Sequence, residues 1–174
     1  MKHIAFLLSD FQSGGTEWFA LRLARGMLAR DVKPIFLVLD PQGDLSDLID
    51  PEIEIISLGG MKYHFWGALR ALPAMVRFLK THQIDAVIGG LTILNIVVSW
   101  ALILSKTKTR FIAVEHMRLS QKAKTLWSKI KRAMKIMLVG ISYLRADEIV
   151  TVSQTAKQDL IRLAGIHPEK LRII

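Results

Sequence analysis

Residues 4–29 read IAFLLSDFQSGGTEWFALRLARGMLA, and this stretch decides the fold. It begins with an apolar run, Ile4 to Leu8, which has the length of a buried strand and no polar alternation. After a short loop, apolar residues return at helical spacing from about Thr16 to Ala29. A strand, a glycine-containing loop and a helix in this order predict the first unit of an α/β sheet.

Further apolar runs of strand length follow along the chain, and stretches with helical periodicity separate most of them. They cover residues 34–39, 53–58, 86–88, 110–114, 148–152 and 171–174. Continuous apolar runs are typical of parallel strands that helices cover on both faces. We therefore predict an α/β fold, a Rossmann-like doubly wound parallel sheet that occupies residues 1–174 as one domain.

Three later helices are expected. One covers about 66–80, with a kink at Pro73. A buried helix covers 92–104, which is too short for a bilayer span of about 20 residues. A third begins after an N-cap at Ser153 and stops before Gly165.

Composition excludes several classes of site. The chain has no cysteine, so disulfides, thiolate metal sites and cysteine nucleophiles are excluded. Besides His116, the chain has His3, His64, His82 and His167, and these four have no metal-ligand spacing. We therefore expect no metal site. The first apolar run is too short for a signal peptide, and a cytoplasmic protein is expected.

The net charge of +9 is concentrated in one segment. Between His116 and Ala146 there is no Asp or Glu, and apolar residues recur at helical spacing from Ser120 to Leu138. A basic amphipathic helix of this kind suits an anionic membrane surface. The residues expected to face the membrane are Lys122, Lys124, Trp127, Lys129, Lys131, Arg132 and Lys135. The alternative is a surface helix whose apolar face packs on the domain; no nucleic-acid-binding module is recognised.

The paired glycines Gly14 and Gly15 lie between the first strand and the first helix. Small residues let backbone N–H groups approach an anion, and the helix N-terminus favours phosphate there. The alternative is a tight turn that needs a positive φ angle. Glu17, in the first helical turn, would complement the helix dipole.

His116 follows the strand 110–114, so it is expected at the same carboxyl edge of the sheet as the glycine loop. An imidazole there can hydrogen-bond a sugar hydroxyl or a phosphate, or it can simply cap the strand. Glu115 either faces a ligand or points into the sheet with a partner. Trp18 lies off the apolar stripe of its helix, beside Arg22 and Arg25, where it could stack on a sugar, anchor in lipid headgroups or cover a loop.

Three features are similar to the N-terminal domain of the GT-B-fold, family 4 type of retaining glycosyltransferase. They are the Gly14-Gly15-Thr16-Glu17 loop, His116 after a later strand, and the run from Ala146 to Ile174. The resemblance implies sugar transfer from a nucleotide-sugar donor to a lipid, lipopolysaccharide or polysaccharide acceptor with retained configuration. It also implies that Gly14 and Gly15 lie against the donor diphosphate or the acceptor and that His116 contacts the transferred sugar.

The same resemblance implies that this domain holds the acceptor. From their positions in the sequence, Thr16, Glu17, Trp18 and Glu115 are expected at the cleft. A C-terminal domain would hold most of the nucleotide, so the chain is expected to be truncated and to be inactive alone. No tightly bound cofactor is expected, and the enzyme would be peripheral at the inner face of the cell membrane. The alternatives are a non-catalytic nucleotide-binding or phosphate-binding module and a peripheral membrane-binding domain.

Overall fold

The computed structural model describes residues 1–59, 65–116 and 126–174. Within them, seven parallel strands form one sheet in the order β3-β2-β1-β4-β5-β6-β7. The strands are β1 (Lys2–Leu8), β2 (Val32–Val38), β3 (Glu54–Ser57), β4 (Ala86–Gly89), β5 (Arg110–Glu115), β6 (Glu148–Thr151) and β7 (Leu171–Ile173). The predicted Rossmann-like parallel α/β sheet is confirmed.

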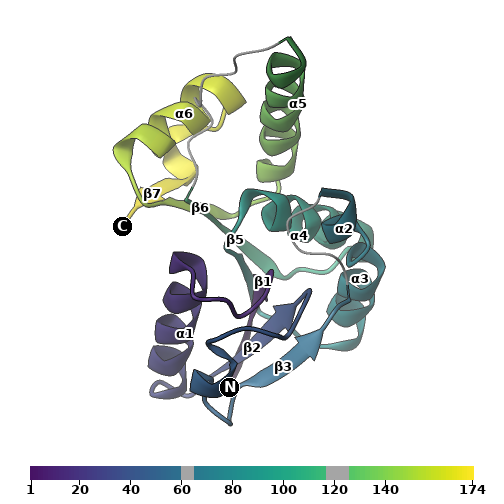
Figure 1. Ribbon diagram of the computed structural model, residues 1–174, viewed down its shortest axis with the longest axis vertical. Coiled ribbons are helices and arrows are strands. Elements are labelled where there is room, and N and C mark those ends of the chain that lie inside the picture. Colours follow the sequence, from purple (N-terminus) through teal and green to yellow (C-terminus); the bar gives the residue numbers. More distant parts are fainter. Residues whose placement is uncertain (60–64, 117–125) are drawn as a thin grey trace.

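Helices cover both faces of this sheet. They are α1 (Gly15–Leu28), α2 (Phe65–Leu69), α3 (Leu72–Thr81), α4 (Thr92–Ser105), α5 (Leu126–Tyr143) and α6 (Gln154–Ala164), with single 3₁₀ turns η1 (Ser46–Leu48) and η2 (Pro168–Lys170). Helix α1 packs on one face, and α3 and α4 pack on the other (Figure 1). None of the described helices is long and apolar enough to cross a membrane.

Pro73 begins a helix instead of kinking one. The expected single helix over 66–80 is wrong: α2 ends at Leu69, and α3 begins at Leu72 with Pro73 in its first turn. Proline has no N–H, and its ring clashes with the carbonyl of the preceding turn in a helix interior. Both problems vanish in the first turn of a helix, where the N–H has no intrahelical acceptor.

The caps expected for the last long helix are confirmed. The Ser153 side chain accepts a hydrogen bond from the Ala156 N–H at 3.2 Å, which satisfies one of the free donors at the start of α6. Gly165 follows the helix in the left-handed region, with φ 67°. Local chemistry alone therefore defines both ends of α6.

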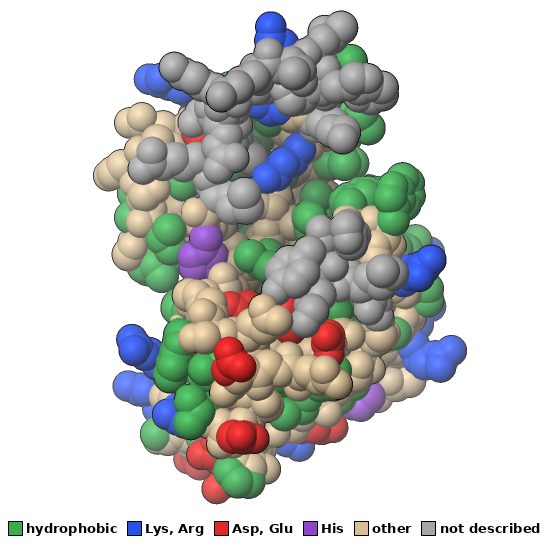
Figure 2. Space-filling view, in the orientation of Figure 1, with side chains coloured by type: hydrophobic (Ala, Val, Ile, Leu, Met, Phe, Trp, Pro, Cys, Tyr) green, Lys and Arg blue, Asp and Glu red, His purple; other side chains and the backbone are tan. Residues whose placement is uncertain are grey.

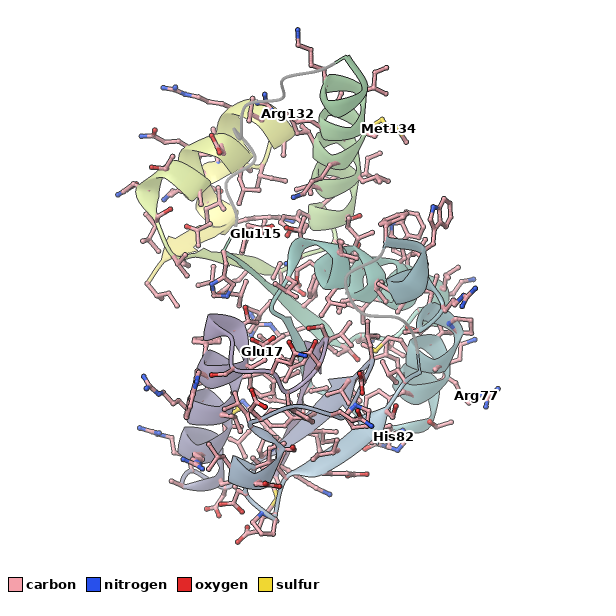
Figure 3. All side chains as sticks on the ribbon, in the orientation of Figure 1. Glu17, Arg77, His82, Glu115, Arg132 and Met134 are labelled. Carbon is pink, nitrogen blue, oxygen red and sulfur yellow. The ribbon has the colours of Figure 1, made fainter. Side chains whose placement is uncertain are left out.

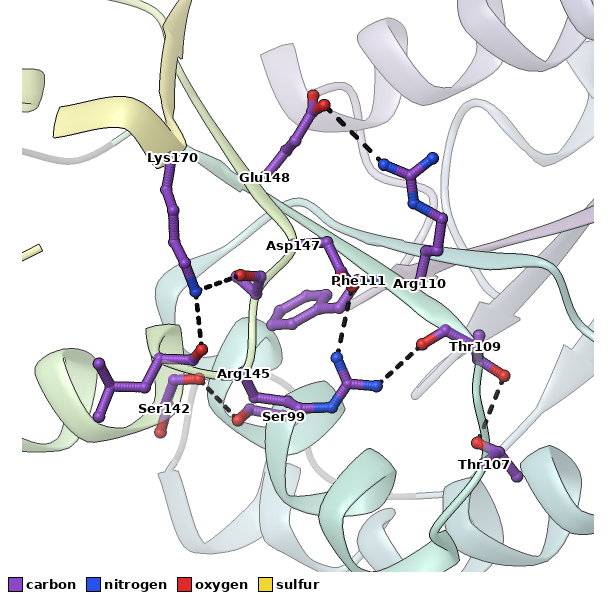
Figure 4. A network of polar contacts seen from close by, with 12 residues as sticks. Ser99, Thr107, Thr109, Arg110, Phe111, Ser142, Arg145, Asp147, Glu148 and Lys170 are labelled. Carbon is purple, nitrogen blue, oxygen red and sulfur yellow. Dashed lines mark hydrogen bonds and ion pairs between the residues drawn. The ribbon is translucent and has the colours of Figure 1, made fainter. Parts of the chain in front are cut away.

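A polar network holds the amino ends of β5 and β6 together (Figure 4). The Phe111 N–H donates to Asp147 at 2.7 Å, and Arg145 donates to the Thr109 carbonyl at 3.0 Å. Lys170 donates to the Leu144 and Ala146 carbonyls at 2.8 and 2.9 Å, which ties η2 to the end of α5. This edge of the sheet is thereby fixed, and the opposite, carboxyl edge carries the candidate site.

Candidate functional site

The carboxyl ends of β1, β4 and β5 form one rim. Strands β1 and β4 are neighbours, yet the helix after β1 covers one face of the sheet and the helix after β4 covers the other. The strand order reverses at this point, which is where open α/β sheets bind ligands. The rim is defined here as the β1–α1 loop, Gly90 and His116.

The structure places the glycine loop and His116 at the same rim. Phe19, in the first turns of α1, lies with its ring centroid 6.5 Å from that of His116 in an edge-to-face arrangement. The start of α1 and the end of β5 are therefore neighbours. A ligand at the rim would meet both the helix N-terminus and the imidazole.

Gly14 and Gly15 have different reasons to be glycine. Gly14 is the N-cap of α1 with φ −109°, so the positive-φ turn considered from sequence is not what it forms. A Cβ on Gly14 would overlap the Glu17 carboxylate, which folds back over the loop. A Cβ on Gly15 would meet nothing within 4 Å, and the residue is exposed. Open space at the first residue of α1 is the approach that an anion needs.

Thr16 fixes the start of α1 to the end of β4. Its methyl group occupies the space that a Cβ on Gly90 would take. Gly89 is similarly close to the Asn95 side-chain oxygen. The sequence analysis singled out neither glycine; for Gly90, only the sheet order shows that the end of β4 meets α1.

Glu17 and Asp10 place two buried carboxylates behind the rim. Burial raises the pKa of Glu17, its own backbone N–H partly offsets this, and the Asp10 charge raises it further. Asp10 is 1% exposed, and one of its oxygens accepts from the Gln12 N–H at 2.9 Å. Its other oxygen has no partner among the described residues. Glu17 was expected at the cleft. Its side chain is instead buried beside the β1–α1 loop (Figure 3).

Replacing Glu17 by glutamine is expected to stabilise the fold at neutral pH. A raised folded-state pKa means that the stability linked to Glu17 is fully present below its unfolded value of 4.5 and is lost as pH rises through the folded pKa. Chemical denaturation of Glu17→Gln should therefore give a higher free energy of unfolding than wild type at pH 7 and a smaller difference near pH 4. The exposed Glu52→Gln is the control; an equal change in both variants would contradict the expectation.

His116 is held as a neutral imidazole. Burial lowers its pKa, and the neighbouring Glu115 charge opposes this only in part. Its Nε2 atom is buried and has no hydrogen-bond partner among the described residues. A neutral imidazole has one donor and one acceptor nitrogen, so it can donate to or accept from a sugar hydroxyl.

Glu115 points away from the rim. Its carboxylate is fully buried and accepts from the Thr92 hydroxyl at 3.0 Å and from the Tyr143 hydroxyl at 2.7 Å. Asn95 donates to Tyr143 at 2.8 Å and to the Val114 carbonyl at 3.0 Å. Of the two placements considered, the structure shows the inward one, so Glu115 is corrected from a cleft residue to a buried link between β5, α4 and α5.

Tyr143 is part of this link because its surroundings keep it protonated. Complete burial raises its pKa well above 10, and the adjacent Glu115 carboxylate adds to the effect. The sequence signal that could have found this network is the set of polar residues Thr92, Asn95 and Ser99 within an otherwise apolar helix. Each of them is buried, and each hydrogen-bonds to a neighbouring element.

Trp18 lies beside the rim on α1. The Arg22 guanidinium carbon lies 5.7 Å from the centroid of its ring, within the range of a cation–π contact. The ring is partly buried against the core that α1 shares with the sheet. The predicted arrangement of an indole beside a cationic group is present.

The basic helix is described only in part. Lys122 and Lys124 lie outside the described residues, as do the side chains of Trp127 and Lys131. Lys129 is exposed, and Arg132 and Lys135 are partly buried. Over the described part of the chain, no three metal-ligating side chains come together.

Gly43, which the sequence analysis did not single out, packs against the β1–α1 loop of the rim. A Cβ there would overlap the backbone of Phe11 and Gln12, and its φ is 156°. Phe11 donates to the Gln42 carbonyl at 3.2 Å and accepts from the Leu45 N–H at 2.9 Å. The loop after β2 therefore sets the position of the loop that leads to Gly14.

Comparison with protein families gives one match. The model named Glycosyltransferase Family 4 matches residues 13–174, which include Gly14, Gly90 and His116 of the rim and every strand except β1. A search of curated proteins finds no match.

Solved structures share the fold at low sequence identity. The lipopolysaccharide outer core galactosyltransferase WaaB aligns with TM-score 0.71 and 16% identity, over 99% of this chain and 44% of that one. HepE from Anabaena, in complex with UDP and glucose, aligns with TM-score 0.75 and 16% identity over 100% and 44%. Sucrose-phosphate synthase from Thermosynechococcus elongatus aligns with TM-score 0.74 and 15% identity over 100% and 48%. The chain spans less than half the length of each of these proteins.

Proposed function

The chain belongs to glycosyltransferase family 4, and from that membership we propose that it is the N-terminal, acceptor-side half of an enzyme that transfers a sugar from a nucleotide-sugar. The observation that carries the proposal is the convergence of the α1 N-terminus and His116 at one rim. This is the arrangement that a negatively charged donor and a sugar ring require together.

Each part of the rim has a role in the proposed reaction. The open backbone at Gly15 receives a phosphate oxygen of the donor, where the helix dipole stabilises the charge that develops on the departing diphosphate. The neutral His116 imidazole hydrogen-bonds a hydroxyl of the transferred sugar. Trp18, with Arg22 over its ring, offers an aromatic surface at the acceptor side.

A second α/β domain is proposed to hold most of the nucleotide. The chain covers only 44% of HepE, which was crystallised with UDP and with UDP-glucose. A rim that faces such a domain would close around the donor, and the 174-residue chain alone would be inactive. The donor is proposed to be a hexosyl nucleotide, bound as a substrate and released after transfer with retained configuration.

The acceptor is proposed to be a lipid, a lipopolysaccharide or a growing polysaccharide of the cell envelope. The galactosyltransferase WaaB, by its name, acts on the lipopolysaccharide outer core. The basic composition of residues 117–146 also favours work at an acidic surface. We place the enzyme in the cytoplasm, peripheral at the inner face of the membrane.

The function is tested by sugar transfer. The full-length protein is incubated with membranes from its host and with one labelled nucleotide-sugar at a time, and label in lipid and polysaccharide fractions is counted. Label from one donor, with the anomeric configuration retained by NMR, is the expected result. No transfer from any nucleotide-sugar, together with tight nucleotide binding by the 174-residue chain alone, would favour a non-catalytic nucleotide-binding module instead.

A further inference from the structure

An apolar stripe runs along the outer face of α5. Its members are large and well exposed: Ile130 (44%), Met134 (54%), Met137 (56%), Ile141 (56%) and, just past the helix end, Leu144 (69%). They follow one another at intervals of four and three residues, which keeps them on one side of a helix. A contiguous set of exposed apolar side chains marks a surface that binds another protein or a membrane.

The opposite face of α5 already packs on the domain. Val139 and Tyr143 are fully buried, and Ile136 packs against the same core. Ser99 of α4 donates to the Ser142 carbonyl at 2.7 Å, which anchors the end of the helix. The packing of α5 on the domain that was considered from sequence is thus made by Ile136, Val139 and Tyr143, while Ile130, Met134 and Met137 stay exposed.

The charges beside the apolar stripe select an anionic partner. Lys129 is exposed and precedes Ile130, Lys135 is partly buried and follows Met134, and Arg132 projects from a different side of the helix than Met134 (Figure 3). Figure 2 shows hydrophobic side chains along the outer edge of α5 with Lys and Arg nearby. A second copy of the chain would bring the same lysines against these, so self-association through the stripe is disfavoured.

An acidic segment lies near the opposite end of the sheet, where Lys33 pairs with Glu54 at 3.5 Å. Residues 40–54, which lead from β2 to β3, contain Asp40, Asp44, Asp47, Asp50, Glu52 and Glu54 and no Lys or Arg. Most of the Asp and Glu side chains visible in Figure 2 lie in its lower half, away from α5. An anionic surface would attract the α5 end and repel the 40–54 end, which gives the domain one preferred orientation.

The N-terminal part of the apolar stripe lies at the same edge of the sheet as the rim. Asn95, in the first turn of α4, contacts Tyr143, the last residue of α5. Since both helices run antiparallel to the strands, the earlier residues of α5 extend past the carboxyl edge of the sheet, and Figure 1 shows α5 extending beyond α4. A surface that contacts the stripe is therefore close to the rim.

We propose that the apolar stripe of α5 inserts into the interface of a bilayer that contains anionic lipids, with the lysines of the same helix reaching toward the headgroups. The helix has the features of an interfacial amphipathic helix, and its core face holds it to the domain. The proposal deepens the proposed function, since it brings the rim to a membrane-borne acceptor. Its test uses no donor and no acceptor, so its failure would leave the transferase proposal standing, and the reverse also holds.

Vesicle binding tests the proposal. The purified chain is co-sedimented with vesicles of phosphatidylcholine alone or mixed with phosphatidylglycerol, at low and high salt. We expect salt-sensitive binding to the anionic vesicles only, and roughly tenfold weaker binding for Met134→Gln/Met137→Gln, because two apolar side chains are lost from the interface. Lys129→Gln/Lys135→Gln is expected to reduce the binding and its dependence on salt.

A matched pair controls for the loss of exposed apolar surface. Leu48 and Ile55 are 43% and 42% exposed at the β3 end of the molecule, so Leu48→Gln/Ile55→Gln should bind as wild type does. Absence of wild-type binding, or equal binding by the Met134→Gln/Met137→Gln variant, would overturn the proposal. A lipid-free dimer that this variant dissociates would overturn it too, because the stripe would then belong to a second copy.

Methionine oxidation gives a second measurement on the unchanged protein. Peroxide should oxidise the exposed Met134, Met137 and Met1, the last of which is 83% exposed and remote from the stripe. Anionic vesicles are expected to slow oxidation of Met134 and Met137 severalfold and to leave Met1 unchanged, as read by mass spectrometry. Equal rates with and without vesicles at all three positions would contradict insertion.

Discussion

Replacing His116 by alanine is expected to lower kcat for sugar transfer by the full-length enzyme roughly a hundredfold or more, because a hydrogen bond at the reacting sugar is lost. The fold should persist, since the side chain is only partly buried and Glu115, which anchors the end of β5, is untouched. The measurement is the initial rate of transfer at saturating donor, with circular dichroism to check folding.

Two variants make the His116 result specific. His116→Gln keeps a hydrogen-bonding side chain without a titrating group and is expected to retain more activity than alanine. His167→Ala removes an exposed imidazole whose described partner is Glu169, at 3.7 Å, and should be as active as wild type. Undiminished transfer by His116→Ala would remove His116 from the site and leave the rim without its proposed sugar contact.

Replacing Gly43 by alanine is expected to destabilise the fold by about 2 kcal/mol or more, because the added methyl would overlap the Phe11 backbone. Backbone cannot rotate aside as a side chain can, so either this loop or the β1–α1 loop must move. Chemical denaturation of the wild-type and variant chains measures the loss. Activity should fall as well, since the displaced loop carries Gly14 and Gly15 to the rim.

Gly26→Ala is the control for Gly43→Ala. Gly26 lies inside α1, and a Cβ there would meet only the end of the Arg30 side chain at 3.7 Å. The helix should gain about 1 kcal/mol from the change, so the two glycine variants are expected to move in opposite directions. Equal stability of Gly43→Ala and wild type would show that the two loops separate easily.

The buried network around Glu115 links the rim to the apolar stripe of α5. Thr92 at the start of α4 and Tyr143 at the end of α5 both donate to the carboxylate that precedes His116. The helix proposed to contact lipid is therefore joined, through Glu115, to the strand that presents the imidazole at the rim. In the proposed enzyme, the same buried network therefore contacts both the membrane-binding helix and the strand that carries His116.

The sequence by itself determined the order and type of most elements. Apolar runs of strand length predicted the seven strands, because a strand that helices cover on both faces has few polar residues. Ser153 and Gly165 ended α6 correctly because capping depends on neighbouring residues alone. Parallel order also placed His116 and the glycine loop at one edge, since carboxyl ends of parallel strands share an edge.

Only the tertiary structure decided which way the side chains at that edge point. Alternation along β5 sends Glu115 to the α4 and α5 face and His116 to the α1 face, and their partners are far apart in sequence. The same holds for Gly43 beneath Phe11 and for the two apolar faces of α5, one buried and one exposed. Local periodicity records that a residue is apolar or small, whereas the element that packs against it is set by the sheet order and the crossovers of the whole chain.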